Sequence, residues 1–180
     1  INGDGTILAI GDAATNRGGF PMRDLKLPPP RPGEVQLWDT KMGALKRTFP
    51  SSHVAVRQLA FSSNARRLAV WTAIYFKGHV ELLDLDSGRL VGAFDDRASG
   101  SVGSILPWLW LNQDASRFIT AYFKGKNIEI RNTADGKLVR KITTPDKAYL
   151  TGFACSSDGR MIASGVGGSV NQVVIWFAED

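Results

Sequence analysis

The four-residue sequence Tyr-Phe-Lys-Gly occurs twice, at residues 75–78 and again at residues 122–125. Aromatic rings can stack on bases or on apolar side chains, and a neighbouring lysine attracts anions. The two copies are therefore a candidate site for an acidic peptide or an unpaired base. The candidate residues are Tyr75, Phe76, Lys77, Tyr122, Phe123 and Lys124. A structural alternative is that the rings cover a hairpin while each Lys-Gly pair makes its turn.

A long segment rich in proline and glycine, residues 11–33, is the second candidate. Its three consecutive prolines favour a polyproline stretch or an open loop over a regular strand. It has four basic residues against two acidic ones, with apolar side chains between them that can anchor a partner. The candidate partner-binding residues are Arg17, Phe20, Arg23, Lys26 and Arg31. The alternative is an insertion that only packs across its own sheet.

The sequence contains none of the motifs of the common enzyme classes. It has no GxSxG nucleophile elbow, no GxxxxGK phosphate loop, no HExxH zinc motif, no cysteine pair and no complete calcium loop. Two histidines and one cysteine leave few combinations of nucleophile and base. We therefore expect no catalytic residues, no metal site and no cofactor.

The composition of the 180 residues is that of an ordinary globular protein, with 43% hydrophobic and 22% charged residues. This excludes a disordered chain and a small disulfide-stapled protein. The formal net charge of +5 does not by itself favour nucleic acid as the partner. The most apolar stretch, residues 102–111, is shorter than the roughly 20 residues that span a bilayer, so we expect no membrane segment. The single cysteine, Cys155, allows no internal disulfide and leaves the compartment open.

The elements that must position the candidate residues form an internal repeat. Four strand-like segments begin at residues 35, 80, 128 and 173, so their spacings are 45, 48 and 45 residues. A second series of turns followed by strands begins upstream of each, at residues 3, 63, 113 and 157. Asp-Gly and asparagine-containing turns supply the positive φ that tight hairpins need. Each period thus holds up to four short strands and no helix.

Four antiparallel strands in about 45 residues are typical of one blade of a β-propeller. We label the strands of a blade a to d from the centre outward, which gives the chain the order b-c-d, a-b-c-d, a-b-c-d and a-b-c. The sequence therefore predicts an all-β partial ring of about 3.5 blades within one domain, residues 1–180. The expected blades cover about residues 1–50, 51–97, 98–145 and 146–180, with residues 11–33 as a long b–c insertion.

At these positions the chain resembles the WD40-repeat family. Leu37-Trp38-Asp39 matches the family's Trp-Asp ending, and residues 61–64 and 154–159 match its Phe-Ser-Pro-Asp-Gly turn. His53 falls near the Gly-His position. The repeats are degenerate, because the Trp position is occupied by Trp38, Leu83, Arg131 and Trp176. A propeller of another repeat type is the close alternative.

The resemblance implies a non-catalytic scaffold that binds a protein or peptide on the side of the disc that carries the b–c and d–a connections. Because the candidate residues there are basic, we expect an acidic partner. The chain begins with Ile1 and stops after a third strand, so we expect it to be the C-terminal half of a larger propeller that self-associates when alone. Two alternatives stay open: a propeller enzyme or cofactor-binding domain completed by other blades, and a propeller that binds RNA.

Overall fold

In the computed structural model, the described residues form an all-β fold of four antiparallel sheets. The structure describes residues 1–12, 33–51, 56–74, 77–96, 107–122, 125–145, 147–168 and 171–178. The predicted series of three, four, four and three strands is confirmed for this part of the chain. None of the sheets closes on itself. No helix in the described ranges is long and apolar enough to cross a membrane.

In each sheet, strands that follow one another in the sequence pair antiparallel as neighbours. Sheet one contains β1 (Ile7–Gly11), β2 (Glu34–Asp39) and β3 (Ala44–Pro50). Sheet two contains β4 (Val56–Phe61), β5 (Arg67–Ile74), β6 (Lys77–Asp84) and β7 (Leu90–Asp96). Sheet three contains β8 (Pro107–Leu111), β9 (Arg117–Tyr122), β10 (Asn127–Asn132) and β11 (Leu138–Thr143). Sheet four contains β12 (Ala148–Cys155), β13 (Met161–Gly168) and β14 (Gln172–Phe177).

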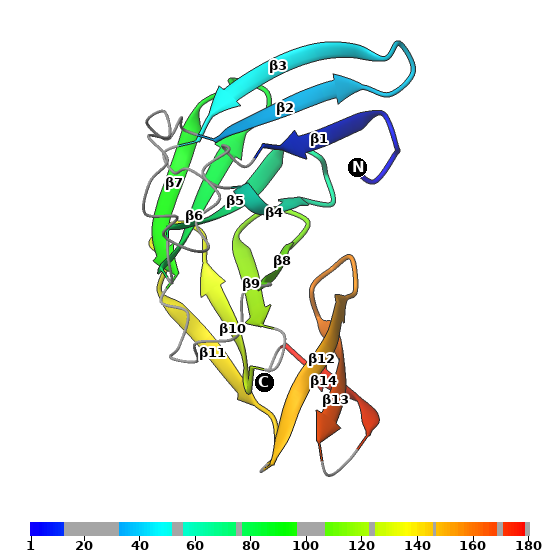
Figure 1. The fold of residues 1–180 in the computed structure, drawn as a ribbon, viewed down its shortest axis with the longest axis vertical. Coiled ribbons are helices and arrows are strands. Elements are labelled where there is room, and N and C mark those ends of the chain that lie inside the picture. The colour runs from blue at the N-terminus through cyan, green and yellow to red at the C-terminus, as the bar shows by residue number, and fades with distance from the viewer. Residues whose placement is uncertain are drawn as a thin grey trace, which may run out of the picture.

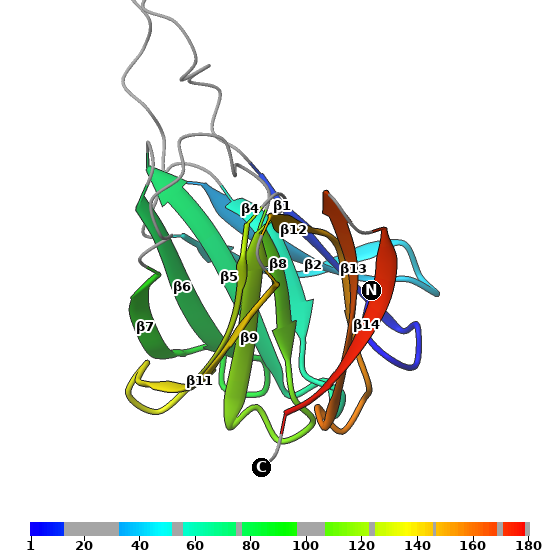
Figure 2. The ribbon, with the colours of Figure 1, turned by 90° about the horizontal axis from the view of Figure 1, so that it is seen from below.

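The sheets follow one another in a curved row, with strands β1, β4 and β8 on the inner side and β3, β7 and β11 on the outer side (Figure 1). Contacts between β1 and β4, between β4 and β8, and between β9 and β12 join successive sheets. Turning the molecule by 90° shows that the strands of neighbouring sheets are inclined to one another (Figure 2). The order of strands from the centre outward that the sequence predicted for each blade corresponds to this arrangement.

Three hydrophobic clusters join the sheets face to face. The first includes Val35 and Leu37 of sheet one with Leu68 and Val70 of sheet two. The second cluster joins sheets two and three, and its buried members are Ala69, Trp71, Val80, Leu82, Leu109, Leu111, Ala115 and Phe118. The third joins sheets three and four through Ile119, Ala121, Ile128, Ile130, Ile142, Leu150, Ile162 and Ala178. Because each cluster is shared by two sheets, the sheets stabilise one another in sequence order.

The a–b turns precede the second strand of each repeat, and each of them contains the same pattern of hydrogen bonds. In sheet three, Asn112 Oδ1 accepts the Arg117 N–H at 2.8 Å and Asp114 Oδ1 accepts the Ser116 N–H at 3.0 Å. The first position of the network is held by Asn2, Ser62, Asn112 and Ser156, and the third by Asp4, Asn64, Asp114 and Asp158. Local side-chain acceptors of this kind fix a turn without help from the rest of the fold.

The c–d turns repeat a second pattern. Asp39 Oδ1 accepts the backbone N–H of Met42 at 2.9 Å, and Asp84 Oδ1 accepts that of Ser87 at 2.6 Å. A glycine with positive φ follows, at Gly43 (61°) and Gly88 (72°). The strand pairing shifts by one residue beside each such turn, between residues 37 and 38, 82 and 83, and 130 and 131. Such bulges increase the local twist of a sheet.

The residue at the Trp position donates to its own strand in sheets one and three and to the neighbouring strand in sheet four. In sheet four, Trp176 Nε1 donates to Ser164 Oγ on the neighbouring strand at 2.8 Å. In sheet one, Trp38 Nε1 donates to Gln36 on its own strand at 3.0 Å. In sheet three, Arg131 stands at this position, and the hydroxyl of the nearby Thr120 has no hydrogen-bond partner among the described residues. Tryptophan is therefore one of several residue types that can occupy this position in the pair of strands b and c.

The carboxylates of the a–b turns should make stability depend on pH. Hydrogen bonds lower the pKa of Asp4, Asp114 and Asp158 below 3.8, first through the Thr6 hydroxyl, the Ser116 N–H and the Ser156 hydroxyl respectively. A carboxyl group whose pKa is lower in the folded than in the unfolded state stabilises the fold above the unfolded pKa. This contribution is lost as the pH falls through the folded pKa.

We expect the triple substitution of these three residues by asparagine to reduce the acid sensitivity of the fold. Asparagine keeps the Oδ1 acceptor, as Asn64 does in sheet two, but it does not titrate. Urea unfolding at neutral pH and at about pH 3 should therefore show a smaller loss of unfolding free energy in the variant than in the wild type. An equal loss in both proteins would show that these turns do not control the acid response.

Two alanines adopt the left-handed backbone conformation that glycine occupies in the equivalent turns. Ala65 has φ 55° and Ala115 has φ 58°, where Gly5 and Gly159 have 74° and 76°. This conformation costs an L-residue about 1 kcal/mol or more, and glycine avoids most of the cost. The two alanines differ in burial, because Ala115 is 5% exposed in the cluster between sheets two and three whereas Ala65 is half-buried outside it.

We expect Ala65→Gly to raise the free energy of unfolding by about 0.5 kcal/mol, after the entropy that glycine adds to the unfolded chain is subtracted. Ala115→Gly should give no gain or a loss, because the buried methyl group contributes about 0.8 kcal/mol. Urea unfolding of both variants measures the difference. An equal effect of the two substitutions would contradict this assignment of burial and strain.

Candidate functional site

In the sequence, the candidate residues fall in or beside the connections between strands b and c, and we call the corresponding edge of the row of sheets the loop edge. It is the edge at which strands b and c, and strands d and a, are connected. Nine of the eleven candidates lie outside the described residues: Arg17, Phe20, Arg23, Lys26, Arg31, Tyr75, Phe76, Phe123 and Lys124. Lys77 is the first residue of β6, and its backbone pairs with Ile74 of β5. Tyr122 is the last residue of β9.

Tyr122 contributes to the packing between two sheets. Its half-buried ring lies edge-on to the indole of Trp71, with ring centroids 6.4 Å apart and planes inclined by 68°. It also packs against the cluster shared by sheets two and three. Such edge-to-face pairs are worth about 1 kcal/mol beyond the area they bury. The contact supports the structural alternative for this residue, in which the aromatic ring closes the space between neighbouring sheets.

The glycines of the two Tyr-Phe-Lys-Gly copies have different roles. Gly78 lies within β6, opposite Ala73, and a Cβ atom placed there would lie 2.6 Å from Cζ2 of Trp71. Gly125 lies in the connection before β10, where its N–H donates to the carbonyl of Tyr122 at 2.8 Å. Its own carbonyl accepts the N–H of Leu150 from sheet four at 2.9 Å. Only the second copy therefore uses its glycine in a turn.

The polar pairs at the described part of the loop edge include one with a histidine and one with a buried carboxylate. His79 Nδ1 is 3.1 Å from Asp95 Oδ1, across the pairing of β6 with β7. The hydroxyl of Ser51 donates to Glu81 Oε2 at 3.2 Å, and Glu81 is only 4% exposed. Burying a carboxylate costs free energy unless hydrogen bonds compensate it. The hydrogen bond from Ser51 therefore has a structural role, because it compensates part of this cost for Glu81. Neither pair forms part of a metal-ligand cluster, of which the described residues contain none.

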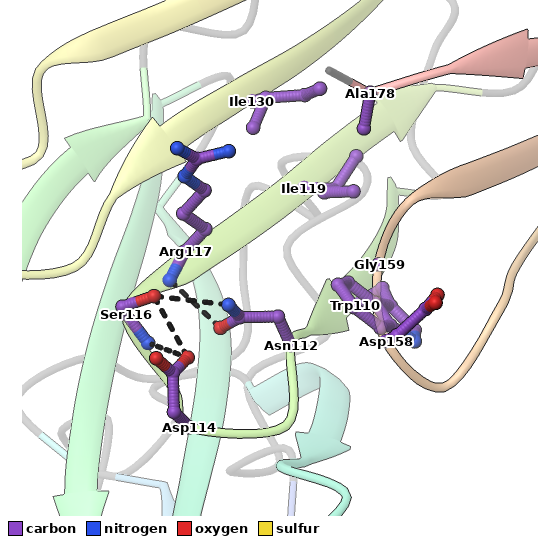
Figure 3. Close-up of a pocket in the computed structure, with 10 residues that line it drawn as sticks. All are labelled: Trp110, Asn112, Asp114, Ser116, Arg117, Ile119, Ile130, Asp158, Gly159 and Ala178. Carbon is purple, nitrogen blue, oxygen red and sulfur yellow. Dashed lines mark hydrogen bonds between the residues drawn. The ribbon is translucent and has the colours of Figure 1, made fainter.

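A hollow of about 230 Å³ opens at the opposite edge, which we call the turn edge, between sheets three and four (Figure 3). The lining residues are Trp110, Asn112, Asp114, Ser116, Arg117, Ile119, Ile130, Asp158, Gly159 and Ala178. Asp114 and Asp158 come from equivalent positions of two a–b turns, and the Arg117 side chain extends toward Ile130. The sequence analysis did not predict this hollow, although the repeat placed both carboxylates in neighbouring turns.

Several polar groups that line the hollow already form hydrogen bonds within the protein, which limits the chemistry of the hollow. Asp114 Oδ1 accepts the Ser116 hydroxyl at 2.8 Å as well as its N–H, and Asn112 Nδ2 donates to the same hydroxyl at 3.0 Å. The indole of Trp110 lies so close to Gly159 that a Cβ atom there would be 2.6 Å from Cη2. The volume is below the range of about 300–1,000 Å³ of small-molecule sites. The hollow is therefore small for a small-molecule site.

The single cysteine is part of the core between sheets three and four. Cys155 ends β12 and packs against the cluster that contains Leu150 and Ile162. Burial raises the pKa of its thiol to about 12. Because the thiolate is the reactive form, this partly buried environment lowers the reactivity of the side chain at neutral pH.

No protein-family model matches the chain, and no curated protein is significantly similar to it in sequence. Among the described residues, the sheets and their turns form a row of similar structural units with different chemistry at its two edges.

The environment of Cys155 predicts slow chemical modification. In the native protein at neutral pH, alkylation by iodoacetamide should be about a hundredfold slower than in urea, where the thiol is exposed and ionises normally. Mass spectrometry of samples quenched over time measures both rates. Labelling of the folded protein at the rate of the unfolded protein would contradict the burial of this thiol between the two sheets.

Proposed function

We propose that this chain is part of a WD40-like β-propeller and serves as a non-catalytic scaffold that binds an acidic protein or peptide at its loop edge. The observation that carries the proposal is the repetition of one structural unit. The four sheets share the a–b turn network, and hydrophobic clusters join each sheet to the next. Such rows of repeats commonly present their connections, rather than their strands, to partners.

The charges of the connections favour the loop edge over the turn edge. The b–c and d–a connections, taken as residues 12–33, 75–77, 95–106, 123–126 and 144–147, contain nine Lys and Arg against five Asp. On the turn edge, residues 1–6, 40–43, 62–66, 85–89, 112–116, 133–137 and 156–160 contain five of each sign. An excess of one sign along one edge attracts a partner of the opposite sign and speeds its association. An acidic partner therefore fits the loop edge.

The described cations of the loop edge support the same direction. Lys126 and Lys147 are both exposed, and they follow the neighbouring b–c and d–a connections of sheets three and four. The backbone carbonyl of Lys126 accepts the N–H of Thr144 at 2.8 Å. This hydrogen bond holds the two connections side by side. Two ammonium groups held on adjacent connections can contact successive carboxylates of an extended peptide.

A binding experiment with two matched variants tests the proposal. The first variant replaces four cations of the long loop with glutamine: Arg17, Arg23, Lys26 and Arg31. The control replaces four exposed cations of the turn edge with glutamine: Lys41, Arg66, Arg89 and Lys137. Both variants lose the same charge, so a non-specific effect of net charge should be equal in the two.

The measured quantity is the affinity for a fluorescent peptide that alternates glutamate with leucine and phenylalanine. We expect the loop variant to bind about tenfold more weakly than the wild type, because charged contacts at a surface typically contribute about 1 kcal/mol together with faster association. The control should bind like the wild type. Equal loss in both variants, or no binding by the wild type, would overturn the assigned site. Tighter binding of a single-stranded RNA with a steep salt dependence would favour the nucleic-acid alternative.

A further inference from the structure

Sheet four, the last sheet of the described row, has an apolar face that no described residue covers. The pairing of β13 with β14 sets Met161 opposite Phe177, Ala163 opposite Ile175 and Gly165 opposite Val173, so these side chains share one face. Val173 is 74% exposed, Ile175 60%, Phe177 62% and Met161 47%. Large apolar side chains grouped on one face in this way mark an interaction surface.

Sheet one ends the row at the other side with a second apolar face. There Leu8 lies opposite Trp38 and Ile10 opposite Gln36, and Trp38 in turn lies opposite Leu45. Leu8 is 38% exposed, Ile10 45% and Leu45 48%. The two faces stand at the two ends of the curved row (Figures 1 and 2).

The other sheets show what covers the face that is equivalent to this face of sheet four. Val173 and Ile175 occupy the same strand positions as three other pairs, Val35 with Leu37, Val80 with Leu82, and Ile128 with Ile130. The members of those pairs are at most 5% exposed. In each case the following sheet covers them. The face of sheet four is therefore the first half of a junction between two sheets.

The face of sheet one is the second half of the same kind of junction. Leu8 occupies the strand position of Leu68, Phe118 and Ile162, each of which packs on the preceding sheet. Those three side chains are 0%, 2% and 0% exposed, against 38% for Leu8. The two ends of the row thus carry complementary halves of a contact that the chain already makes three times within itself.

From this complementarity we infer that two copies of the chain associate head to tail, with the β13–β14 face of each copy packed on the β1–β2 face of the other. A contact between two different surfaces either closes a ring or grows an open filament. The described row is curved (Figure 1), so we expect two copies that meet at both ends to close a ring rather than to grow a filament. This inference concerns the ends of the row and is independent of the partner proposed for the loop edge.

The junction between copies should be weaker than the junctions within a chain. In sheets two, three and four, the inner strands β4, β8 and β12 contribute Val56, Leu109 and Leu150 to the covered face. Within the described residues, β1 has no inner neighbour in its sheet, so this face of sheet one is one strand narrower. We therefore expect a dissociation constant of about micromolar rather than a permanent dimer.

The test uses one substitution on each face and sedimentation velocity over a range of concentrations. Ile175→Arg blocks the β13–β14 face, Ile10→Arg blocks the β1–β2 face, and Val139→Arg on β11 is the control, because Val139 is 44% exposed but belongs to neither face. All three positions are exposed, so the fold should be retained, which circular dichroism and urea unfolding verify. We expect the wild type and the control to sediment at twice the chain mass of 19.6 kDa.

Each face variant alone should weaken dimerisation about a hundredfold, because an unpaired arginine would have to be buried in an apolar contact. An equimolar mixture of the two should recover a 1:1 dimer, since Ile10→Arg still has an intact β13–β14 face and Ile175→Arg an intact β1–β2 face. This dimer has one junction and should be weaker than the wild-type ring.

Four outcomes would overturn the inference. A wild type that stays monomeric would show that a second copy of the chain does not cover the two faces. A face variant that dimerises alone like the wild type would show like faces pairing with like faces. Open-ended oligomers would exclude the two-copy ring, and a mixture that remains monomeric up to the highest concentration would exclude head-to-tail contact.

Discussion

The middle sheets of this molecule are apolar on both faces, and the arrangement of the other sheets follows from that constraint. In β5 the consecutive residues Leu68, Ala69, Val70 and Trp71 are all buried. Since neighbouring side chains of a strand point to opposite faces, such a run needs cover on two sides. Sheet two can be covered on both sides only between two neighbours, and the same holds for sheet three with Phe118 and Ile119. A stacked row of sheets satisfies both at once.

The turns make this row possible by fixing each hairpin with local chemistry. Polar side chains of the a–b turns accept backbone N–H groups within a few residues, and the c–d turns combine an aspartate with a glycine. Hairpins that are specified locally need few contacts across the sheet, so the strands are free to carry whatever apolar side chains the next sheet requires. This explains why the Trp position can hold tryptophan, leucine or arginine without a change in the order of strands.

Much of the fold could be predicted from the sequence because the strongest signals are local. The spacing of Gly43, Gly88 and Gly136 placed the c–d turns, and the alternation around Val35 and Val80 placed the strands that precede them. Contacts between residues on different strands or turns could not be predicted from these local signals. Examples are the bond from Trp176 to Ser164, the position of Gly78 inside β6 and the hollow between two turns that are 44 residues apart. Of the candidate site, only the Tyr122 side chain lies in the described part, and its contact is with Trp71.

Stacking in a row also determines where the molecule opens first. Among the described residues, sheets two and three have hydrophobic clusters on both faces, whereas sheets one and four have a cluster on one face only. In a linear array of units that contact only their neighbours, the free energy of local opening is lowest at the ends and rises toward the middle. Amide hydrogens of β1 and β14 should therefore exchange with solvent through partial unfolding, while those of β5 and β9 exchange only when the whole row unfolds. A ring has no such ends, so closing the row would convert graded opening into a single cooperative transition.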